Sequence, residues 1–452
     1  MSRQELRASI GLAGIFGLRM LGMFLILPVF ALYAERLPGG NDHFIVGIAL
    51  GAYALTQAIL QIPFGWLSDR YGRKPTIYGG LVLFAIGSFV AAMASNIYIV
   101  ILGRVIQGSG AISAAVIALA ADLTREEHRT KAMAVIGMTI GVTFGVSLVA
   151  GPALNNLIGV PGIFAMTGIL ALLAIPYVFA VIPNPLQSKF HSDAETQPKK
   201  FMDVLKDPQL ARLNFGIFAL HSALMALFIV VPFALRRNGL DVNHHWQVYL
   251  PVMLASFVLI IPAIIYAEKR GKLKAIFIAA IATAFAAQIL LATQLNSLSG
   301  IALSLLIFFT AFNLLEASLP SLISKIAPAN AKGTAIGVYS SIQFLGAAVG
   351  AAVGGWLSQH VGGNAVFAFC GVLMLCWLVL AITMKAPPAV RTKMYPIEAM
   401  DDARADNLTR QLTRLTGVRE ALVLAEEGVA YLKVDIAGFD EQNVMSVLGK
   451  ES

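Results

Sequence analysis

Long apolar runs are the dominant pattern of the chain. A hydrocarbon core about 30 Å thick needs roughly 20 apolar residues per helix, and twelve stretches reach that length. Runs such as 79–92 lack the in-and-out alternation of barrel strands, so the pattern predicts helices. The first stretch is too long for a cleaved signal peptide and is expected to remain as a helix. The expected spans are 8–32, 45–68, 76–94, 98–121, 133–156, 163–182, 209–235, 246–267, 273–292, 298–324, 333–357 and 363–384.

The positive charges between these spans are distributed unevenly. Most Lys and Arg residues of the loops lie on the side of the N-terminus, whereas Arg36, Arg236 and Arg237 lie on the other side. Short loops rich in Lys and Arg stay in the cytoplasm. The pattern therefore predicts a multi-pass membrane protein with both termini in the cytoplasm.

A polar stretch divides the spans into six and six. We expect an N-terminal half at 1–182, a cytoplasmic linker at 183–208 and a C-terminal half at 209–385. Part of the linker could form an amphipathic helix on the membrane surface. The sequence PFGWLSDRYGRK at 63–74 has a degenerate counterpart, PAIIYAEKRGKLK, at 262–274. Repeated halves with a substrate site between them are a transporter architecture.

The chain changes character after the last span. A linker is expected at 386–394, followed by a small α+β domain at 395–452. The polar and apolar pattern predicts the order β-α-β-β-α, which is most of a ferredoxin-like unit. This domain has no Cys, which argues against metal carriage. The predicted elements are a strand near 395–400, a helix at 403–415, a hairpin of 418–424 and 429–436, and a helix at 440–448 capped by Asp440.

Composition and charge exclude several classes of function. The chain is 58% apolar, 13% charged and has a mean hydropathy of +0.76, which excludes a soluble enzyme for most of its length. The net charge of +8 comes from the membrane part, so it does not indicate nucleic-acid binding. Cys370 and Cys376 point about 120° apart on a helix, which favours neither a disulfide nor a metal site. Because the chain has no nucleotide-binding loop, catalytic constellation or cofactor motif, we expect an ion or substrate gradient to supply the energy.

The stretch 65–74 between the second and third spans carries the most specific motif. It reads GWLSDRYGRK and resembles the G-x-L-x-D-R-x-G-R-K signature of the major facilitator superfamily. Gly65 would let another helix approach closely, and Gly72 would allow a tight turn. Asp69 and the cations Arg70, Arg73 and Lys74 would supply switchable charge contacts at a cytoplasmic gate. The alternative is that these cations only determine topology.

Two further motifs carry the same resemblance. Arg104, Gln107 and Ala111 share one helical face and match the R-x-x-Q-G-x-G-A motif of the fourth helix, whose Arg the family links to proton coupling. A purely structural pairing of Arg104 is the alternative. Small residues of the fifth span resemble the antiporter motif but lack its terminal glycine pair, so packing is an equally good interpretation. These residues are Gly141, Gly145, Gly151 and Pro152.

Together with the stretches 21–34 and 121–134, these motifs resemble the twelve-helix drug:proton antiporter branch, and the appended domain resembles its YajR-type members. The resemblance covers nearly the whole chain and implies a major facilitator fold in a bacterial inner membrane. It implies rocker-switch efflux of small amphipathic or cationic compounds, with the lipid bilayer, protons and substrate as partners. It also implies a charge relay of Asp69, Arg73 and Asp122 at the gate. The alternatives are an uptake symporter or facilitator, and a sensor that signals through the C-terminal domain by a ligand or by self-association.

Other polar residues lie deep within the spans. Arg19 is expected near the midplane, where it needs a cavity or a counter-charge, and Glu316 and Asp122 are the candidates. Glu316 could carry the proton, because burial disfavours a charged carboxylate, or it could pair with substrate or with a buried cation. Asp122 is the alternative proton carrier. His221 lies midway along the seventh span, where a packing role is more common than proton transfer.

Overall fold

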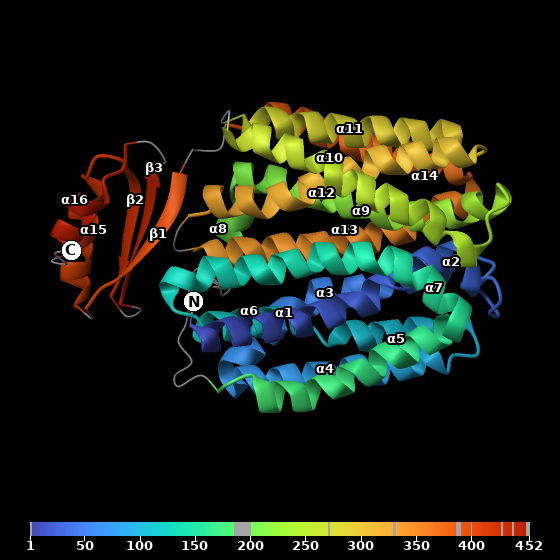
Figure 1. The fold of residues 1–452 in the computed structure, drawn as a ribbon, viewed down its shortest axis with the longest axis horizontal. Helices are drawn as coiled ribbons and strands as arrows, with labels where there is room; N and C mark the ends of the chain where they lie inside the picture. Colours follow the sequence, from blue (N-terminus) through green and yellow to red (C-terminus); the bar gives the residue numbers. More distant parts are fainter. Residues whose placement is uncertain are drawn as a thin grey trace.

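The computed structural model describes residues 2–184, 200–269, 272–328, 331–385, 390–398, 400–425, 428–435 and 438–448. Within these ranges, eleven helical stretches are long and apolar enough to cross a membrane, and two of them consist of two successive α-helices. They form an elongated bundle of roughly aligned helices with a small sheet at one end (Figure 1). The bundle helices are α1 (Arg3–Phe24), α2 (Leu27–Ala34), α3 (His43–Tyr71), α4 (Arg73–Ala92), α5 (Ile97–Ser109), α6 (Ser113–Asp122), α7 (Glu126–Val181), α9 (Pro208–Arg237), α10 (Trp246–Lys269), α11 (Leu273–Gln294), α12 (Leu298–Ile326), α13 (Lys332–His360) and α14 (Gly363–Ile382).

The eleven helices accommodate the twelve expected spans because α7 contains two of them. Its 56 residues would extend about 84 Å as a straight helix, far more than one membrane thickness. Gly159 breaks it with a φ of 67°, between the expected fifth and sixth spans. The first span consists of α1 and α2, and the fourth consists of α5 and α6 with a break at Gly110.

Matching contacts relate the two halves of the bundle. Lys74 Nζ donates to the carbonyl of Ile182 over 2.5 Å, and Lys274 Nζ donates to the carbonyl of Ile382 over 3.0 Å. Each bond spans 108 residues and ties the third helix of its half to the sixth. This repetition agrees with the repeated motif in the sequence, although part of its second copy lies outside the described residues.

The bundle has two distinct ends. We call the end near Tyr71 and Ile326 the tail end, because the C-terminal sheet lies there, and the end near Ala34 and Arg237 the far end. The N-terminus also lies at the tail end (Figure 1). The short helix α8 (Phe201–Lys206) precedes α9, with Val204 buried. A 3-10 turn, η2 (Val242–His244), precedes α10.

The C-terminal domain has the expected β-α-β-β-α order. Its antiparallel strands lie in the order β1-β3-β2, and Asp440 caps α16 as expected. Alternate residues of β3, among them Leu432, pack toward α15 and α16, while Tyr431 belongs to a cluster on the opposite face. Lys433 Nζ reaches the carbonyl of Ala327 at the end of α12 over 2.5 Å, so the sheet contacts the bundle. The elements are β1 (Val390–Pro396), α15 (Asp402–Thr413), β2 (Val418–Leu424), β3 (Val429–Asp435) and α16 (Glu441–Val447).

The predicted position of the first strand was wrong. The expectation near 395–400 placed it too late, since β1 begins at Val390, within the stretch expected to be a linker. Its residues pair with β3 from Val390 opposite Asp435 to Pro396 opposite Val429. As an edge strand, β1 tolerates charged side chains, which made it look like a linker in the sequence.

Candidate functional site

Small residues bring the two halves into backbone contact at the far end. A Cβ atom on Gly47 of α3 would lie 2.2 Å from the carbonyl oxygen of Ala351 on α13. A Cβ on Gly355 would lie 2.3 Å from the carbonyl oxygen of His43. Both distances are far below van der Waals contact, so only glycine fits at these crossings. The far end is therefore closed along the α3 and α13 contact.

Polar contacts reinforce this closure. Arg236 at the end of α9 donates to both carboxylate oxygens of Glu35, over 2.6 and 3.0 Å. The backbone N–H of His43 donates to Gln359 Oε1 over 2.9 Å, and Asn155 Nδ2 donates to Asn243 Oδ1 over 3.0 Å. Each bond joins the N-terminal half to the C-terminal half. Nothing local in the sequence predicts these pairs, because the two partners of each lie far apart along the chain.

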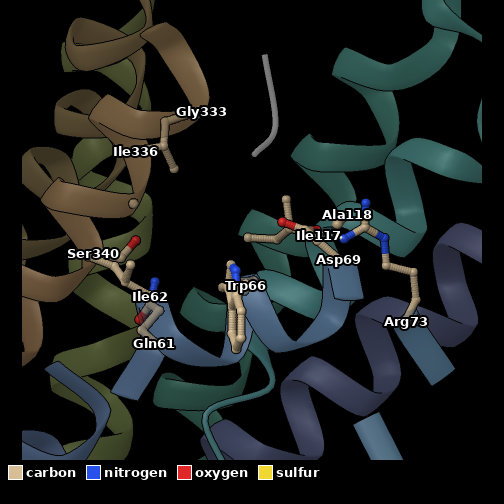
Figure 2. A pocket seen from close by; sticks show the side chains of 13 residues that line it. Gln61, Ile62, Trp66, Asp69, Arg73, Ile117, Ala118, Gly333, Ile336 and Ser340 are labelled. Carbon is tan, nitrogen blue, oxygen red and sulfur yellow. Dashed lines mark hydrogen bonds and ion pairs between the residues drawn. The ribbon is translucent and has the colours of Figure 1, made fainter. Parts of the chain in front are cut away.

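The tail end opens into a cleft between the halves. Gly333, Ile336 and Ser340 of α13 form one wall, and residues of α3 and α6 form the other (Figure 2). Gly65 lies on the second wall, where a Cβ would meet the Ala114 Cβ at an ordinary 3.4 Å. The close helix approach expected at Gly65 is therefore absent in this conformation. The other lining residues are Gln61, Ile62, Trp66, Asp69, Arg73, Ile117, Ala118 and Gly337.

A charge cluster lies beside this cleft. Arg73 forms an ion pair with Asp69, and its Nε donates to Asp122 Oδ2 over 3.1 Å. Gly72 ends α3 with a φ of 97°, which lets α4 start at Arg73. This turn brings the Arg73 side chain next to Asp69 in the last turn of α3. The side chain of Arg73 is 3% exposed and that of Asp69 is 41% exposed, so Asp69 is the member that faces open space. The structure thus brings together the three residues of the expected relay, all within the N-terminal half.

The two remaining cations of the motif lie outside this cluster. The Arg70 guanidinium is 5.3 Å from the centre of the Trp66 ring and 5.6 Å from that of Tyr71. Lys74 donates to the carbonyl of Ile182 instead. Arg70 therefore contacts aromatic rings of its own helix, α3, and Lys74 connects α4 to the residue after α7. The arrangement expected of the relay is formed by Asp69, Arg73 and Asp122.

A central cavity lies between the halves. Its polar lining comes from both: Gln61 and Ser113 from the N-terminal half, and His221, Ser340 and Gln343 from the C-terminal half. Apolar side chains form the rest, which suits a ligand with an apolar body and few polar groups. These are Phe16, Met20, Met23, Phe24, Ile117, Ile140 and Phe344.

Glu316 belongs to a polar cluster on the C-terminal side of this cavity. Gln343 Nε2 lies 3.2 Å from Glu316 Oε1 and 2.8 Å from His221 Nε2. His221 Nε2 is 3.9 Å from the second carboxylate oxygen. His221 therefore lies on the cavity wall beside the carboxylate of Glu316. Gln343 was missed, although a glutamine inside a span is itself a signal of a polar cavity.

The expected counter-charge of Arg19 is not its partner in the structure. Arg19 Nη1 donates to Ser113 Oγ over 2.5 Å, and neither Glu316 nor Asp122 is its partner. Arg104 Nη1 donates to Gln107 Oε1 over 2.5 Å, so these two residues share a face as expected. The Arg104 guanidinium also lies 4.7 Å from the centre of the Tyr53 ring.

These neutral contacts do not balance two buried charges. Within the residues that the structure describes, no carboxylate pairs with Arg19 or Arg104, and both side chains are fully buried. A desolvated cation–π contact contributes about 2 kcal/mol, and a hydrogen bond to a charged group about 1.5–3 kcal/mol. Burying one ion costs several kcal/mol, so a surplus of positive charge remains in the N-terminal half.

Two small residues of the fifth span lie at contacts between helices, whereas a Cβ on Gly141 would meet nothing within 4 Å. A Cβ on Gly151 would lie 2.4 Å from the carbonyl oxygen of Leu25, so α7 touches the backbone of the first span there. Gly145 faces Phe257 of α10, where a Cβ would lie 3.3 Å from its ring. Pro152 lies within the helical part of α7. These contacts favour the packing interpretation of the motif.

Comparison with known proteins agrees with this architecture. The model of the Major Facilitator Superfamily matches residues 12–351 and 246–417. The chain is 45% identical to the "Inner membrane transport protein YajR" of Escherichia coli strain K12, over 96% of this chain and 95% of that protein. It is 27% identical to the "Multidrug resistance protein MdtH" of Aeromonas hydrophila, over 80% and 88% of the two chains.

A solved structure shows the same fold. The crystal structure of a bacterial homologue of the human lysosomal transporter Spinster, in an inward-facing and occupied conformation, matches with a TM-score of 0.68. The match covers 84% of this chain and 97% of that one, at 14% identity. With the family match over most of the chain and the close relative, the conclusion is direct: this chain belongs to the Major Facilitator Superfamily.

Proposed function

We propose that this protein is a proton-coupled secondary transporter that exports small amphipathic compounds across the bacterial inner membrane by rocker-switch alternating access. The observation that carries the proposal is the difference between its two ends. The halves touch at Gly47 and Ala351 at the far end, and a cleft separates them at Asp69 and Ile336 at the tail end. A central cavity with polar groups from both halves lies between.

The charge distribution and the named relatives support outward transport across the inner membrane. The excess of Lys and Arg in loops at the tail end places both termini in the cytoplasm, so the open cleft faces inward. The relatives named as an inner membrane transport protein and a multidrug resistance protein support export from a bacterial cell. The C-terminal domain is then a cytoplasmic module at the mouth of the cleft.

Closure of the tail end would use the charge cluster. Asp69 lies on one wall of the cleft, and α13 begins at Lys332 on the other. A helix N-terminus attracts a carboxylate, so the approach of α13 would give Asp69 a partner across the cleft. Arg73 holds Asp69 and Asp122 within the N-terminal half while the cleft is open. The cluster can thus exchange contacts within one half for contacts between halves.

Proton coupling is assigned to Glu316. Its carboxylate lies beside Gln343 and His221, which line the cavity. Protonation would remove a negative charge from the cavity and change how the two halves attract each other. Replacing Glu316 with Gln keeps its shape and removes its titration, so transport in proteoliposomes should continue without dependence on an imposed pH gradient. Unchanged pH dependence would exclude Glu316 as the proton carrier.

Alternating access itself can be tested with spin labels. With Cys376 replaced by Ser, labels at Trp66 and Ile336 report the tail end, and labels at Arg36 and Arg237 report the far end. We expect two distance populations at each end in reconstituted protein, with one end opening as the other closes when a pH gradient is imposed. A single unchanging distance at both ends would contradict the mechanism.

A further inference from the structure

Two buried cations of the N-terminal half, Arg19 and Arg104, have unused hydrogen-bond donors. Nε and Nη2 of Arg19, and the same two atoms of Arg104, are buried and have no hydrogen-bond partner in the part of the chain that the structure describes. Arginine stays protonated even when buried. Two permanent charges and four unused donors therefore lie in one region of the bundle.

This region borders the cavity. Ser113 Oγ accepts from Arg19 and is itself part of the cavity lining. The Arg104 guanidinium lies 4.7 Å from the centre of the Tyr53 ring. Charges in a low-dielectric interior are screened little and act over longer distances than at a surface. The cavity is therefore at a positive potential on the side of Ser113.

The opposite wall does not cancel this potential. On that side the carboxylate of Glu316 accepts a hydrogen bond from Gln343, and it lies 3.9 Å from His221. A single carboxylate cannot neutralise two guanidinium groups, and within the described residues Arg19 and Arg104 hydrogen-bond to Ser113 and Gln107 instead of to Glu316. A cationic cargo would meet net repulsion, whereas an anionic cargo would supply the missing charge.

We propose that the transported compound carries an anionic group, such as a carboxylate or sulfonate on an apolar body, that docks on the Arg19 and Ser113 side of the cavity. The inference rests on the proposed transport function and replaces the expectation of a cationic cargo. Phe16, Met20 and Phe344 would contact the apolar body, and Gln61 could donate to the anion. An inside-negative membrane potential drives an anion outward, which agrees with export.

A pair of dyes with one scaffold and opposite charge tests this proposal. Fluorescein is an anion and rhodamine 123 is a cation with the same fused ring system. Binding to the purified full-length protein in a neutral maltoside detergent is measured by fluorescence anisotropy. We expect fluorescein to bind about tenfold more tightly than rhodamine 123. Equal affinity, tighter binding of rhodamine 123, or binding of neither dye would overturn the proposal.

Two variants separate the charge from the shape of the site. Arg19→Met should weaken fluorescein binding about 30-fold, while Arg19→Lys, the matched control, should retain most of it. Glu316→Gln should tighten fluorescein binding, because it removes a negative charge near the cavity, whereas a cation site would lose affinity. If Arg19→Met does not elute as a folded monodisperse protein, Arg104→Met takes its place. Unchanged binding in the Met variant, or loss in Glu316→Gln, would refute an anion site.

Failure of this inference is distinguishable from failure of the proposed function. The dye experiment measures binding alone and needs no transport. Transport of rhodamine 123 without any fluorescein binding would leave alternating access intact and overturn the anionic cargo. Fluorescein that binds but is not moved in proteoliposomes, together with immobile spin-label distances, would instead overturn the transporter.

Discussion

The two ends of the bundle are held by different kinds of contact. At the far end, Gly47 and Gly355 let the backbones of α3 and α13 touch, and the closure depends mainly on shape. At the tail end, Asp69, Arg73 and Asp122 satisfy one another within one half and leave a cleft. Shape contacts respond little to charge, whereas an ion cluster can be repartnered. Regulation of the cycle is therefore expected at the tail end.

Arg73→Ala should have the largest effect. Removing one partner from a buried ion cluster costs about 3–5 kcal/mol, because the carboxylates of Asp69 and Asp122 then repel each other. We expect transport in proteoliposomes to fall at least roughly 100-fold, with the protein still in the membrane. Arg73→Lys keeps the positive charge but lacks the planar guanidinium that contacts both Asp69 and Asp122. Its transport rate should lie between those of Arg73→Ala and the wild type. Wild-type flux in Arg73→Ala would show that the cluster has no role in the gate.

Gly47→Ala should open the far end. A Cβ at this position would lie 2.2 Å from the Ala351 carbonyl oxygen, so the helices must separate. Overpacking of this kind costs about 1–3 kcal/mol, which would reduce the far-closed population roughly tenfold. The matched control is Gly141→Ala, since a Cβ on Gly141 meets nothing within 4 Å. Spin-label distances between Arg36 and Arg237 would show the shift, and equal distances in both variants would break the comparison.

The sequence predicts the helices and the charge cluster better than it predicts the contacts between halves. Apolar runs define each span because lipid requires them, and the spacing from Gly65 to Lys74 fixes Asp69, Gly72 and Arg73 on adjoining turns. Glu35 and Arg236 are 201 residues apart, and nothing local indicates that they pair. Long-range pairing follows from how the halves pack, which a single sequence does not contain.

The partners of polar side chains inside the bundle are also difficult to predict from the sequence. Arg19 was expected to need a cavity or a counter-charge, and within the described residues it contacts Ser113 of the cavity lining and no carboxylate, because α1 packs against α6. The start of β1 at Val390 was not predicted, because its partner β3 lies about 40 residues later and its own sequence is rich in charged residues. In both cases tertiary contacts outweigh the local signal.

Lys433→Met should loosen the C-terminal domain from the tail end. Lys433 donates to the Ala327 carbonyl at the end of α12 over 2.5 Å and pairs with Glu420 over 3.0 Å. Loss of a hydrogen bond from a charged group costs about 1.5 kcal/mol or more, or roughly a tenfold change in the docked fraction. Faster amide hydrogen exchange near Ala327 would reveal it.

Lys393→Met is the control for that experiment. Lys393 pairs with Glu441 over 2.7 Å inside the domain, and it lowers the pKa of the Glu441 carboxyl together with the Tyr395 hydroxyl. Its loss should raise the pKa of Glu441 without changing exchange near Ala327. Equal exchange in the two variants would mean that Lys433 does not dock the domain.

Glu35→Gln should have the smallest effect, and its dependence on salt sharpens the contrast between the two ends. The Glu35 and Arg236 side chains are 31% and 47% exposed, so their ion pair contributes only about 0.2–1 kcal/mol. The far-closed population should fall roughly twofold at low ionic strength, and the difference should vanish near 1 M salt, where the screening length is about 3 Å. The same spin-label pair at Arg36 and Arg237 measures both conditions. A tenfold opening, comparable with Gly47→Ala, would mean that charge and not shape closes the far end, and the distinction between the two ends would no longer hold.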